Sequence, residues 1–382
     1  MLLHRTSIND ARVRREASAL AEAGCEVYIL ELASVDEHVD VGEGVRRISV
    51  LPPHRVRSRA PTIAYRTAFL AAFTPAIRRL RPQVVHAHDA ATLLPGLLGA
   101  RLTGARLVYD SHELASGVQY RSGAWAAFVN GIERLGATRA DAVITVSDEI
   151  ADRLESRYRL PSRPCVIRNV CALRRPNGSR PGGLRAAVGV SDAPLILHQG
   201  AAAPGRGCET LLRAIARLDD SVRLVFLGSI EPGYGPHLDA LVDQLDLRAR
   251  VHRLPNAPLD ELLTWTREAD VGVSLLEPTC ENYRLTIPNK LFEYVASEVP
   301  VVASAGSAAG SLVRERTLGW TADSDDPESV ANALRAAIAA RGDTALRDRL
   351  HAADATFRWE AEQTRLTALY RRLSPVPGVQ KP

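Results

Sequence analysis

The chain has 382 residues and a formal net charge of +4 at pH 7, with 46% hydrophobic and 24% charged residues. These totals are those of a water-soluble globular protein, and the length predicts two domains. Aromatic residues make up only 5%, and the basic residues form no stripe, which argues against a nucleic-acid binder. No apolar stretch reaches the roughly 18 residues of a membrane span, and the first residues do not resemble a signal peptide. We therefore expect a cytoplasmic protein.

Cysteine and lysine usage narrows the chemistry further. The five cysteines lack any metal-ligand spacing, so the sequence predicts no metal site: Cys25, Cys165, Cys171, Cys208 and Cys280. Nearly all basic residues are arginine, and Lys290 is the one lysine besides the terminal Lys381. Lys290 is therefore a candidate for a chemical role, although chance also explains a single lysine.

The first half of the chain alternates apolar runs with helical patterns. A helix is predicted over residues 10–23, capped by Asn9 or Asp10. Strands are predicted at residues 2–3, 26–30, 47–51, 84–87, 106–109 and 142–146. Strands that are apolar throughout and separated by helices indicate a parallel sheet covered on both faces.

The alternation of apolar runs and helical patterns stops after the first half of the chain and then resumes. Residues 173–183 (LRRPNGSRPGG) have the Pro- and Gly-rich composition of a linker. Further strands are predicted at residues 194–198, 223–228, 251–254, 271–275 and 300–304, and a last helix at about 358–373. The pattern predicts an α/β protein with two domains, 1–178 and 179–357, followed by a C-terminal helix and tail, 358–382.

A Gly-rich segment follows the first strand of the second domain. In HQGAAAPGRG, Gly200 permits close backbone approach to a ligand, and Arg206 precedes a predicted helix. A helix N-terminus with an adjacent cation suits a diphosphate. The alternative is a Gly-rich turn with a surface arginine.

A second segment, residues 286–304 (TIPNKLFEYVASEVPVVAS), predicts a helix that begins near Pro288 and is capped by Asn289. Lys290 then lies in the first turn, and Glu293 one turn later can accept hydrogen bonds from the hydroxyls of a ribose. The alternative is an exposed ion pair between Lys290 and Glu293.

Two polar clusters follow neighbouring strands of the first domain. One is His86, His88 and Asp89, and the other is Asp110, His112 and Glu113. Ligands bind at the carboxyl ends of the strands in open α/β sheets, so both clusters are candidates for a site. Structural histidines are the alternative.

Together these segments resemble a retaining glycosyltransferase of the GT-B fold, specifically glycosyltransferase family 4. The resemblance covers nearly the whole chain, through VVHAHD, LVYDSHEL, ADAVITVSDEI and VIRNV, then HQG…RG, ADVGVSLLEP, PNKLFEYVASEVPVVAS and the last helix. It implies two Rossmann-like parallel-sheet domains that face a central cleft, with the C-terminal helix crossing back to the first domain.

The motifs and the resemblance together assign the site residues. His112, against the donor sugar, Arg206, on the diphosphate, and Lys290 are expected to be catalytic, and Glu293 is expected to hold the ribose. The expected donor-binding residues are Gly200, Arg206, Arg253, Leu254, Pro288, Asn289, Lys290, Leu291 and Glu293, and the expected acceptor-side residues are His88, Asp89 and Glu113.

The chain departs from the family pattern at two positions. Leu285 stands where the first acid of a paired-glutamate motif is expected, and Ala201 replaces an arginine. Glu277, Glu281 or the backbone amides of residues 286–290 are candidates to replace the acid. These departures leave the donor sugar open.

The resemblance implies transfer of a hexose-type sugar, with retained configuration, from a nucleotide sugar to a hydroxyl acceptor in bacterial glycoconjugate, polysaccharide or natural-product biosynthesis. UDP-sugars are expected first and GDP-sugars second. No cofactor is required, while a non-essential Mg²⁺, peripheral membrane contact and a homodimer stay open. The alternatives are a nucleotide-sugar epimerase, which needs no acceptor, and a non-catalytic sugar-nucleotide-binding protein.

Overall fold

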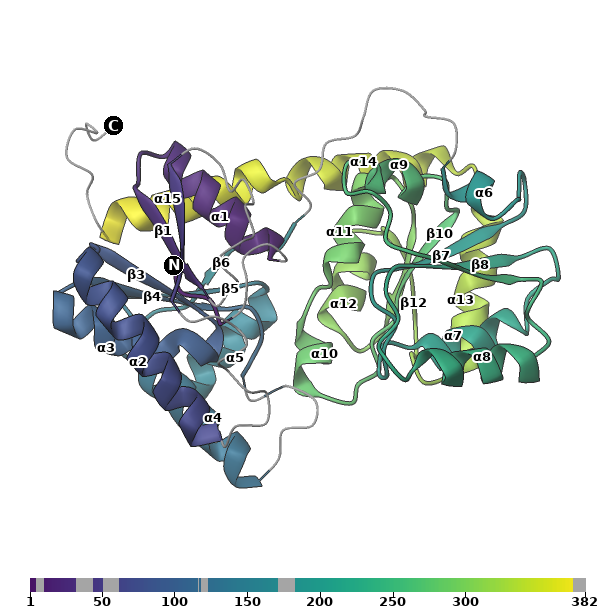
Figure 1. Ribbon diagram of the computed structural model, residues 1–382. Helices are drawn as coiled ribbons and strands as arrows, with labels where there is room; N and C mark the ends of the chain where they lie inside the picture. The colour runs from purple at the N-terminus through teal and green to yellow at the C-terminus, as the bar shows by residue number, and fades with distance from the viewer. Residues whose placement is uncertain are drawn as a thin grey trace. The chain divides into compact units, whose positions relative to one another are not determined.

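The computed structural model describes residues 1–4, 10–31, 44–50, 62–115, 117, 123–170 and 183–373, without the side chains of 62–69, 124 and 125. The chain divides into two compact units (Figure 1). The first comprises residues 1–169 with 360–382, and the second residues 170–359. The predicted linker and the expected boundary between 178 and 179 fall outside the described residues, except for Gly183 at the linker's end.

The first unit is built around parallel strands. These are β1 (Val27–Glu31), β2 (Val45–Ser49), β3 (Val84–His88), β4 (Arg106–Ser111), β5 (Ala142–Thr145) and β6 (Cys165–Val166). Leu2 bridges Leu30 and Ala87, so the chain start lies between β1 and β3. The helices are α1 (Ala11–Glu22), α2 (Thr62–Leu80), α3 (Asp89–Thr103), α4 (Gly123–Ala137), α5 (Asp148–Tyr158) and α15 (Trp359–Leu373).

Local signals explain where these helices begin and end. The Asp10 side chain accepts a hydrogen bond from the Val13 N–H, and Ser147 caps α5 in the same way. Helix α3 ends at Gly104, whose φ of 73° suits glycine. The predicted caps of α1 are thus confirmed for Asp10.

Helix α15 completes the first unit from the far end of the sequence. The Tyr370 hydroxyl lies 2.8 Å from His86 Nδ1, and Glu362 accepts a hydrogen bond from the Arg168 N–H at 3.2 Å. Gln363 donates to Glu22 at the end of α1, beside which α15 runs (Figure 1). The last helix therefore packs on the first unit.

The second unit has one six-stranded parallel sheet in the order β12-β11-β10-β7-β8-β9. Its strands are β7 (Leu195–Gln199), β8 (Arg223–Leu227), β9 (Val251–Leu254), β10 (Val271–Ser274), β11 (Val301–Ser304) and β12 (Gly319–Ala322). Its helices are α6 (Leu184–Ala187), α7 (Cys208–Ile215), α8 (Gly235–Gln244), α9 (Leu262–Thr266), α10 (Glu281–Leu285), α11 (Asn289–Ala296), α12 (Ala308–Glu315), α13 (Pro327–Ala339) and α14 (Thr344–Thr356).

The strand order of this sheet points to a binding position. The chain runs outward from β7 to β9, then returns to β10 and runs outward in the other direction. The order therefore reverses between β7 and β10, and ligands of doubly wound sheets bind at the carboxyl ends of the strands at such a point. Every residue of β7, β10 and β11 is buried, as expected for strands covered on both faces.

The structure corrects the predicted elements in a few places. Strands β6 and β12 were not predicted, because β6 has two residues and β12 has the half-buried pattern of an edge strand. Helix α11 begins at Asn289 after Pro288, so Asn289 is the first helical residue and not the cap.

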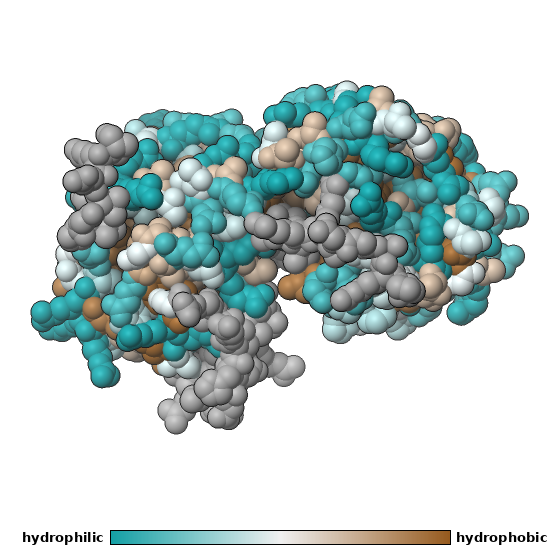
Figure 2. All heavy atoms as spheres, turned by 90° about the horizontal axis from the view of Figure 1, so that it is seen from above, coloured by the Kyte–Doolittle hydropathy of each residue, from teal (hydrophilic) through white to brown (hydrophobic). Residues whose placement is uncertain are grey.

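The surface carries no continuous apolar band in the view of Figure 2, where hydrophilic side chains are interspersed with small hydrophobic patches. None of the helices in the described ranges is both long and apolar enough to cross a membrane. A cavity of about 320 Å³ lies in the first unit, lined by the first residues of β1 and β3. It lies at the amino ends of these strands and also reaches His86 and Tyr370.

Candidate active site

The loop after β7 brings backbone and one cation to the carboxyl end of the central strand. Gly200, Gly205 and Gly207 have φ values of 86°, 79° and 66°, which glycine adopts without strain. Gly207 is the N-cap of α7 and offers no side chain as a capping acceptor. The sequence therefore forms a tight turn that presents Arg206 and the first amides of α7, as predicted from the Gly-Arg-Gly motif.

Lys290 and Arg206 form a cationic pair at this edge of the sheet. Lys290 Nζ lies 3.4 Å from His198 Nε2, and a Cβ placed on Gly200 would be 4.0 Å from Lys290 Cε. Arg206 Nη1 donates to the Ala201 carbonyl at 3.3 Å, while its Nε is buried with no hydrogen-bond partner in the described part of the chain.

Burial and like charge explain the pKa values of this pair. Desolvation, reinforced by Arg206, lowers the pKa of Lys290 to about 8. Desolvation also lowers the pKa of His198 well below its ordinary value, and both cations add to that effect. The imidazole is therefore neutral, and the pocket holds more positive charge than its surroundings neutralise. An anion bound here would relieve that imbalance.

Glu293 lies one turn into α11, where its carboxylate is held from β7. Gln199 Nε2 donates to Glu293 Oε2 at 2.5 Å, and the Thr266 hydroxyl lies 2.6 Å from Gln199 Oε1. The structure thus places Glu293, Lys290 and the α7 turn at one end of the sheet. Sequence reasoning missed Gln199 and Thr266, because a polar residue in a strand or a short helix carries no signal of its partner.

The other residues predicted to bind the donor differ in their burial and in their contacts. Leu291 is fully buried in the core, so it supports α11 from within. Arg253 pairs with Asp239 at 2.8 Å, and Leu254 accepts a backbone hydrogen bond from the Gly228 N–H. Leu285 ends α10 and is half-buried. Of the residues considered as replacements for the missing acid, Glu277 has its pKa raised by burial and by Glu209.

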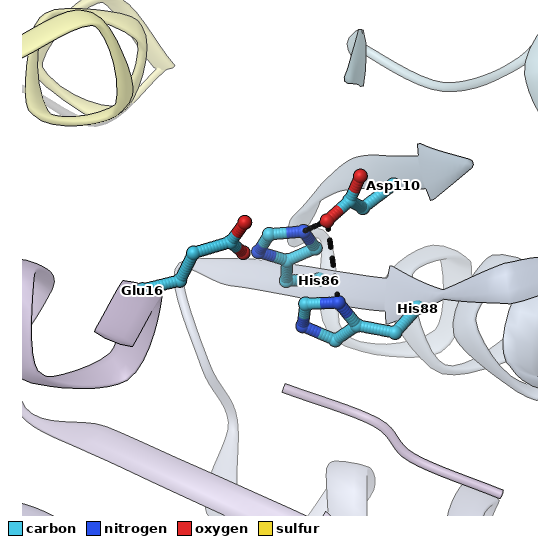
Figure 3. Close-up of side chains that lie close together, drawn as sticks. All are labelled: Glu16, His86, His88 and Asp110. Atoms are coloured by element: carbon cyan, nitrogen blue, oxygen red, sulfur yellow. Dashed lines mark ion pairs between the residues drawn. The ribbon is translucent and has the colours of Figure 1, made fainter. Parts of the chain in front are cut away.

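The first unit gathers a buried polar cluster where β3 and β4 end (Figure 3). His86 and His88 point to one side of β3 with their rings stacked 4.1 Å apart, and Asp110 from β4 faces both. His112 Nε2 lies 3.1 Å from Asp110 Oδ2 and 3.2 Å from His88 Nδ1. Members of both clusters predicted from the sequence therefore form one network, which joins His88 and Asp89 to Asp110 and His112.

Among the histidines of this network, His112 carries the positive charge. Burial lowers the pKa of His112, but Asp89 and Asp110 more than offset this and raise it to about 9. Arg12 and His112 overcome the effect of burial on Asp110 and hold its pKa well below the ordinary value. Burial lowers the pKa of His88, which is therefore neutral at pH 7. His112 is thus the cationic member of the histidines.

Glu16, His86, His88 and Asp110 could be read as metal ligands, since one atom of each lies within 4.8 Å of the others. Arg12 argues against that reading. Its Nε lies 3.0 Å from both Glu16 Oε1 and Asp110 Oδ2, and its Nη1 donates to the Ile167 carbonyl. The guanidinium already offsets the charge of Asp110, and burial raises the pKa of Glu16 to about 8, so a divalent cation there would meet a buried like charge and a carboxyl group that is largely protonated at pH 7. These residues do not fit a metal.

The acceptor-side candidates differ in exposure. The side chain of His88 is only 2% exposed, whereas that of Asp89 is 22% exposed and Glu113 lies at the surface. Asp89 also has a φ of 61°, unusual for a residue with a side chain, at the turn from β3 into α3. His88 therefore supports the network from within, and Asp89 and Glu113 are the two that solvent reaches.

Family models agree with this architecture. The sequence matches the model described as Glycosyltransferase Family 4 over residues 11–175 and the model described as Glycosyl transferases group 1 over residues 193–340. The two matches cover the described sheets of both units. Together the two matches identify the chain as a glycosyltransferase of the GT-B fold and of the family 4 type.

Curated relatives are also glycosyltransferases. A D-inositol 3-phosphate glycosyltransferase from Pseudarthrobacter chlorophenolicus is 28% identical over 85% of this chain and 80% of the relative. A glycogen synthase from Mycobacterium tuberculosis is 28% identical over 94% of this chain and 89% of the relative. A D-inositol 3-phosphate glycosyltransferase from Xylanimonas cellulosilytica is 32% identical, over 47% of this chain and 42% of the relative.

Solved structures share the fold at low identity. Sucrose-phosphate synthase from Thermosynechococcus elongatus has a TM-score of 0.75 at 21% identity, covering 94% of this chain and 92% of that one. Anabaena Alr3699/HepE, solved in complex with UDP, has a TM-score of 0.75 at 14% identity, covering 97% of this chain and 99% of that one.

Proposed function

We propose that the protein transfers a hexose-type sugar from a nucleoside diphosphate sugar to a hydroxyl acceptor with retention of configuration. UDP-sugars are the first candidates and GDP-sugars the second. The observation that carries the proposal is the cationic pocket of the second unit, where Arg206 and Lys290 lie beside the first turns of α7 and α11. Glycosyltransferase relatives and a fold neighbour solved with UDP support it.

The chemistry follows from where negative charge develops. As the bond between the anomeric carbon and the phosphate oxygen breaks, charge grows on the departing diphosphate. Arg206, Lys290 and the helix amides stabilise that charge, a contribution of about 10²–10³ in rate for one well-placed donor. The acceptor oxygen bonds to the anomeric carbon on the same face, and its proton passes to the departing phosphate oxygen.

A covalent route would need a carboxylate free to attack the anomeric carbon. Asp110 is fully buried and bonded to Arg12, so it is unsuited to that role. This favours same-face attack. The roles that the family resemblance gives to His112 and to the acceptor-side residues remain predictions.

Substitution of Arg206 or Glu293 by alanine tests the site. Each variant should lower transfer at least tenfold, because each removes a charged partner worth more than ~1.4 kcal/mol. Transfer is measured as nucleoside diphosphate release in the presence of acceptor mixtures, after a thermal-shift panel of UDP-, GDP- and ADP-sugars has identified the donor. Arg213→Ala, on the exposed face of α7, is the matched control and should be unchanged. Wild-type turnover in both site variants would refute the assignment.

Donor incubated alone separates the alternatives. An epimerase would form an isomer of the nucleotide sugar without acceptor, and a binding protein would shift in melting temperature without turnover. The proposal predicts slow hydrolysis at most until acceptor is added, because water is then the sole nucleophile.

A further inference from the structure

We propose that Gln199, held by Thr266, is a positioning residue that orients Glu293 toward the ribose of the donor nucleotide. The inference deepens the proposed function and rests on it. Its basis is a chain of side chains from three elements: Thr266 at the end of α9, Gln199 at the end of β7 and Glu293 in α11.

The chain is buried except at its last member. Thr266 is 0% exposed and Gln199 3% exposed, whereas Glu293 is half-buried at the carboxyl end of the sheet. The Gln199 backbone also donates its N–H to the Tyr294 hydroxyl at 2.9 Å, so main chain and side chain of one residue both bond to α11. Gln199 is therefore fixed against the helix that carries Glu293.

The ionised carboxylate determines the direction of every hydrogen bond in the chain. Glu293 can only accept, so the Gln199 amide must turn its Nε2 toward Glu293 and its Oε1 toward Thr266. Thr266 has a single hydroxyl proton, and the Leu262 carbonyl at 2.7 Å competes for it. The amide orientation assigns that proton to Gln199, since otherwise Oε1 would be buried without a donor.

This arrangement has a functional consequence for Glu293. One carboxylate oxygen is occupied by a charge-assisted hydrogen bond, which restricts the rotamers of a side chain that would otherwise lose entropy on binding. A carboxylate fixed before the nucleotide arrives binds a diol more tightly than a mobile one. Gln199 should thus strengthen recognition of the ribose hydroxyls and leave the rest of the nucleotide unaffected.

A comparison of two nucleotides isolates the contribution of the ribose hydroxyls to binding. Calorimetry measures the Kd of UDP (or of GDP, if the panel selects GDP) and of its 2′,3′-dideoxy analogue for the wild type, Glu293→Ala, Gln199→Leu and Thr266→Val. The wild type should prefer the ribose form, and Glu293→Ala should lose the preference. Gln199→Leu should reduce the preference roughly tenfold, since it removes a hydrogen bond to a charged group. The exposed Gln244→Leu is the control and should match the wild type.

A merely structural role predicts a different result. General damage to the pocket would weaken the binding of both nucleotides equally, whereas loss of positioning would weaken only the binding of the ribose form. Gln199→Glu gives a second readout: two facing carboxylates share a proton at low pH, so the preference for the ribose form should fall as pH rises, with no such trend in the preference of the wild type. If Gln199→Leu fails to fold, Thr266→Val decides, with an expected loss of about fivefold in the preference.

The outcomes separate the two levels of the proposal. If Glu293→Ala loses the preference for the ribose form but Gln199→Leu keeps it, the positioning role is overturned and the ribose site stands. Thr266→Val replaces Gln199→Leu in this test if Gln199→Leu fails to fold. An unchanged preference in Glu293→Ala, or no nucleotide binding by the wild type, overturns the ribose assignment and the positioning role with it.

Discussion

Two partly buried residues, Lys290 and His112, show that a positive charge can either lower or raise the stability of the folded protein. Lys290 has its pKa lowered to about 8 by desolvation and Arg206. His112 has its pKa raised to about 9, because Asp89 and Asp110 outweigh its burial. The folded protein therefore disfavours the charge on Lys290 and favours the charge on His112.

Replacement of Lys290 by methionine should stabilise the protein and weaken donor binding. The folded pKa lies below the ordinary 10.5, so the protonated lysine costs stability, fully below pH 8 and progressively less as pH rises toward 10.5. Lys290→Met should raise stability at pH 7 by about 1 kcal/mol or more and lower nucleotide affinity at least tenfold. Urea unfolding and calorimetry measure the two effects. A lower stability at pH 7 would contradict this account.

His112 should impose a pH dependence on the stability of the first unit. Its folded pKa lies above the ordinary 6.5, so the stabilisation, up to about 3 kcal/mol, is complete below pH 6.5 and is lost as pH rises through about 9. His112→Gln should flatten the decline between pH 6.5 and 9 in urea unfolding curves. The exposed His351→Gln serves as control, and the same slope in wild type and His112→Gln would refute the assignment.

At the scale of elements, the turn before α7 depends on glycine. A Cβ on Gly207 would lie 2.6 Å from the Leu275 Cβ, at a φ of 66°. Gly207→Ala should therefore lower stability by more than the ~1–2 kcal/mol of the left-handed backbone alone, and should weaken nucleotide binding by moving Arg206.

Gly189 provides the matched control for this turn. Its φ is 69°, and a Cβ there would meet nothing within 4 Å. Gly189→Ala pays the energetic cost of the left-handed backbone without the steric clash. The difference in thermal stability between the two variants therefore measures the cost of the contact with Leu275. Equal losses would show that the clash is relieved locally.

At the scale of the whole molecule, the first unit is completed by α15, which comes from the far end of the sequence. The Tyr370 hydroxyl meets the buried His86 Nδ1 at 2.8 Å. Tyr370→Phe should lower the stability of the first unit by about 1–2 kcal/mol, because a buried ring nitrogen loses its partner. Hydrogen exchange should quicken in β3 and β4 and stay unchanged in β10 and β11.

Tyr28→Phe is the control for this helix, since its hydroxyl bonds to the exposed Glu26 in the same unit. It should change stability by less than about 0.5 kcal/mol. Faster exchange throughout the second unit in Tyr370→Phe would contradict the assignment of α15 to the first unit.

The sequence by itself determined the class of fold and the motifs of the cationic pocket proposed to bind the donor. All-apolar strands such as β7 and β10 and Gly-Arg-Gly before α7 are local signals, because propensity, burial pattern and turn chemistry act within a few residues. Short or edge elements such as β6 and β12 carry too little of that signal to be predicted.

Only the tertiary structure decided which polar side chains meet. Gln199 reaches Glu293, which is 94 residues away, and Arg12 bridges to Asp110 across 98 residues. Such contacts also buried His88 and made His112 the charged histidine of its network. Hydrogen bonds and pKa values depend on distance and desolvation, and neither is encoded by spacing along the chain.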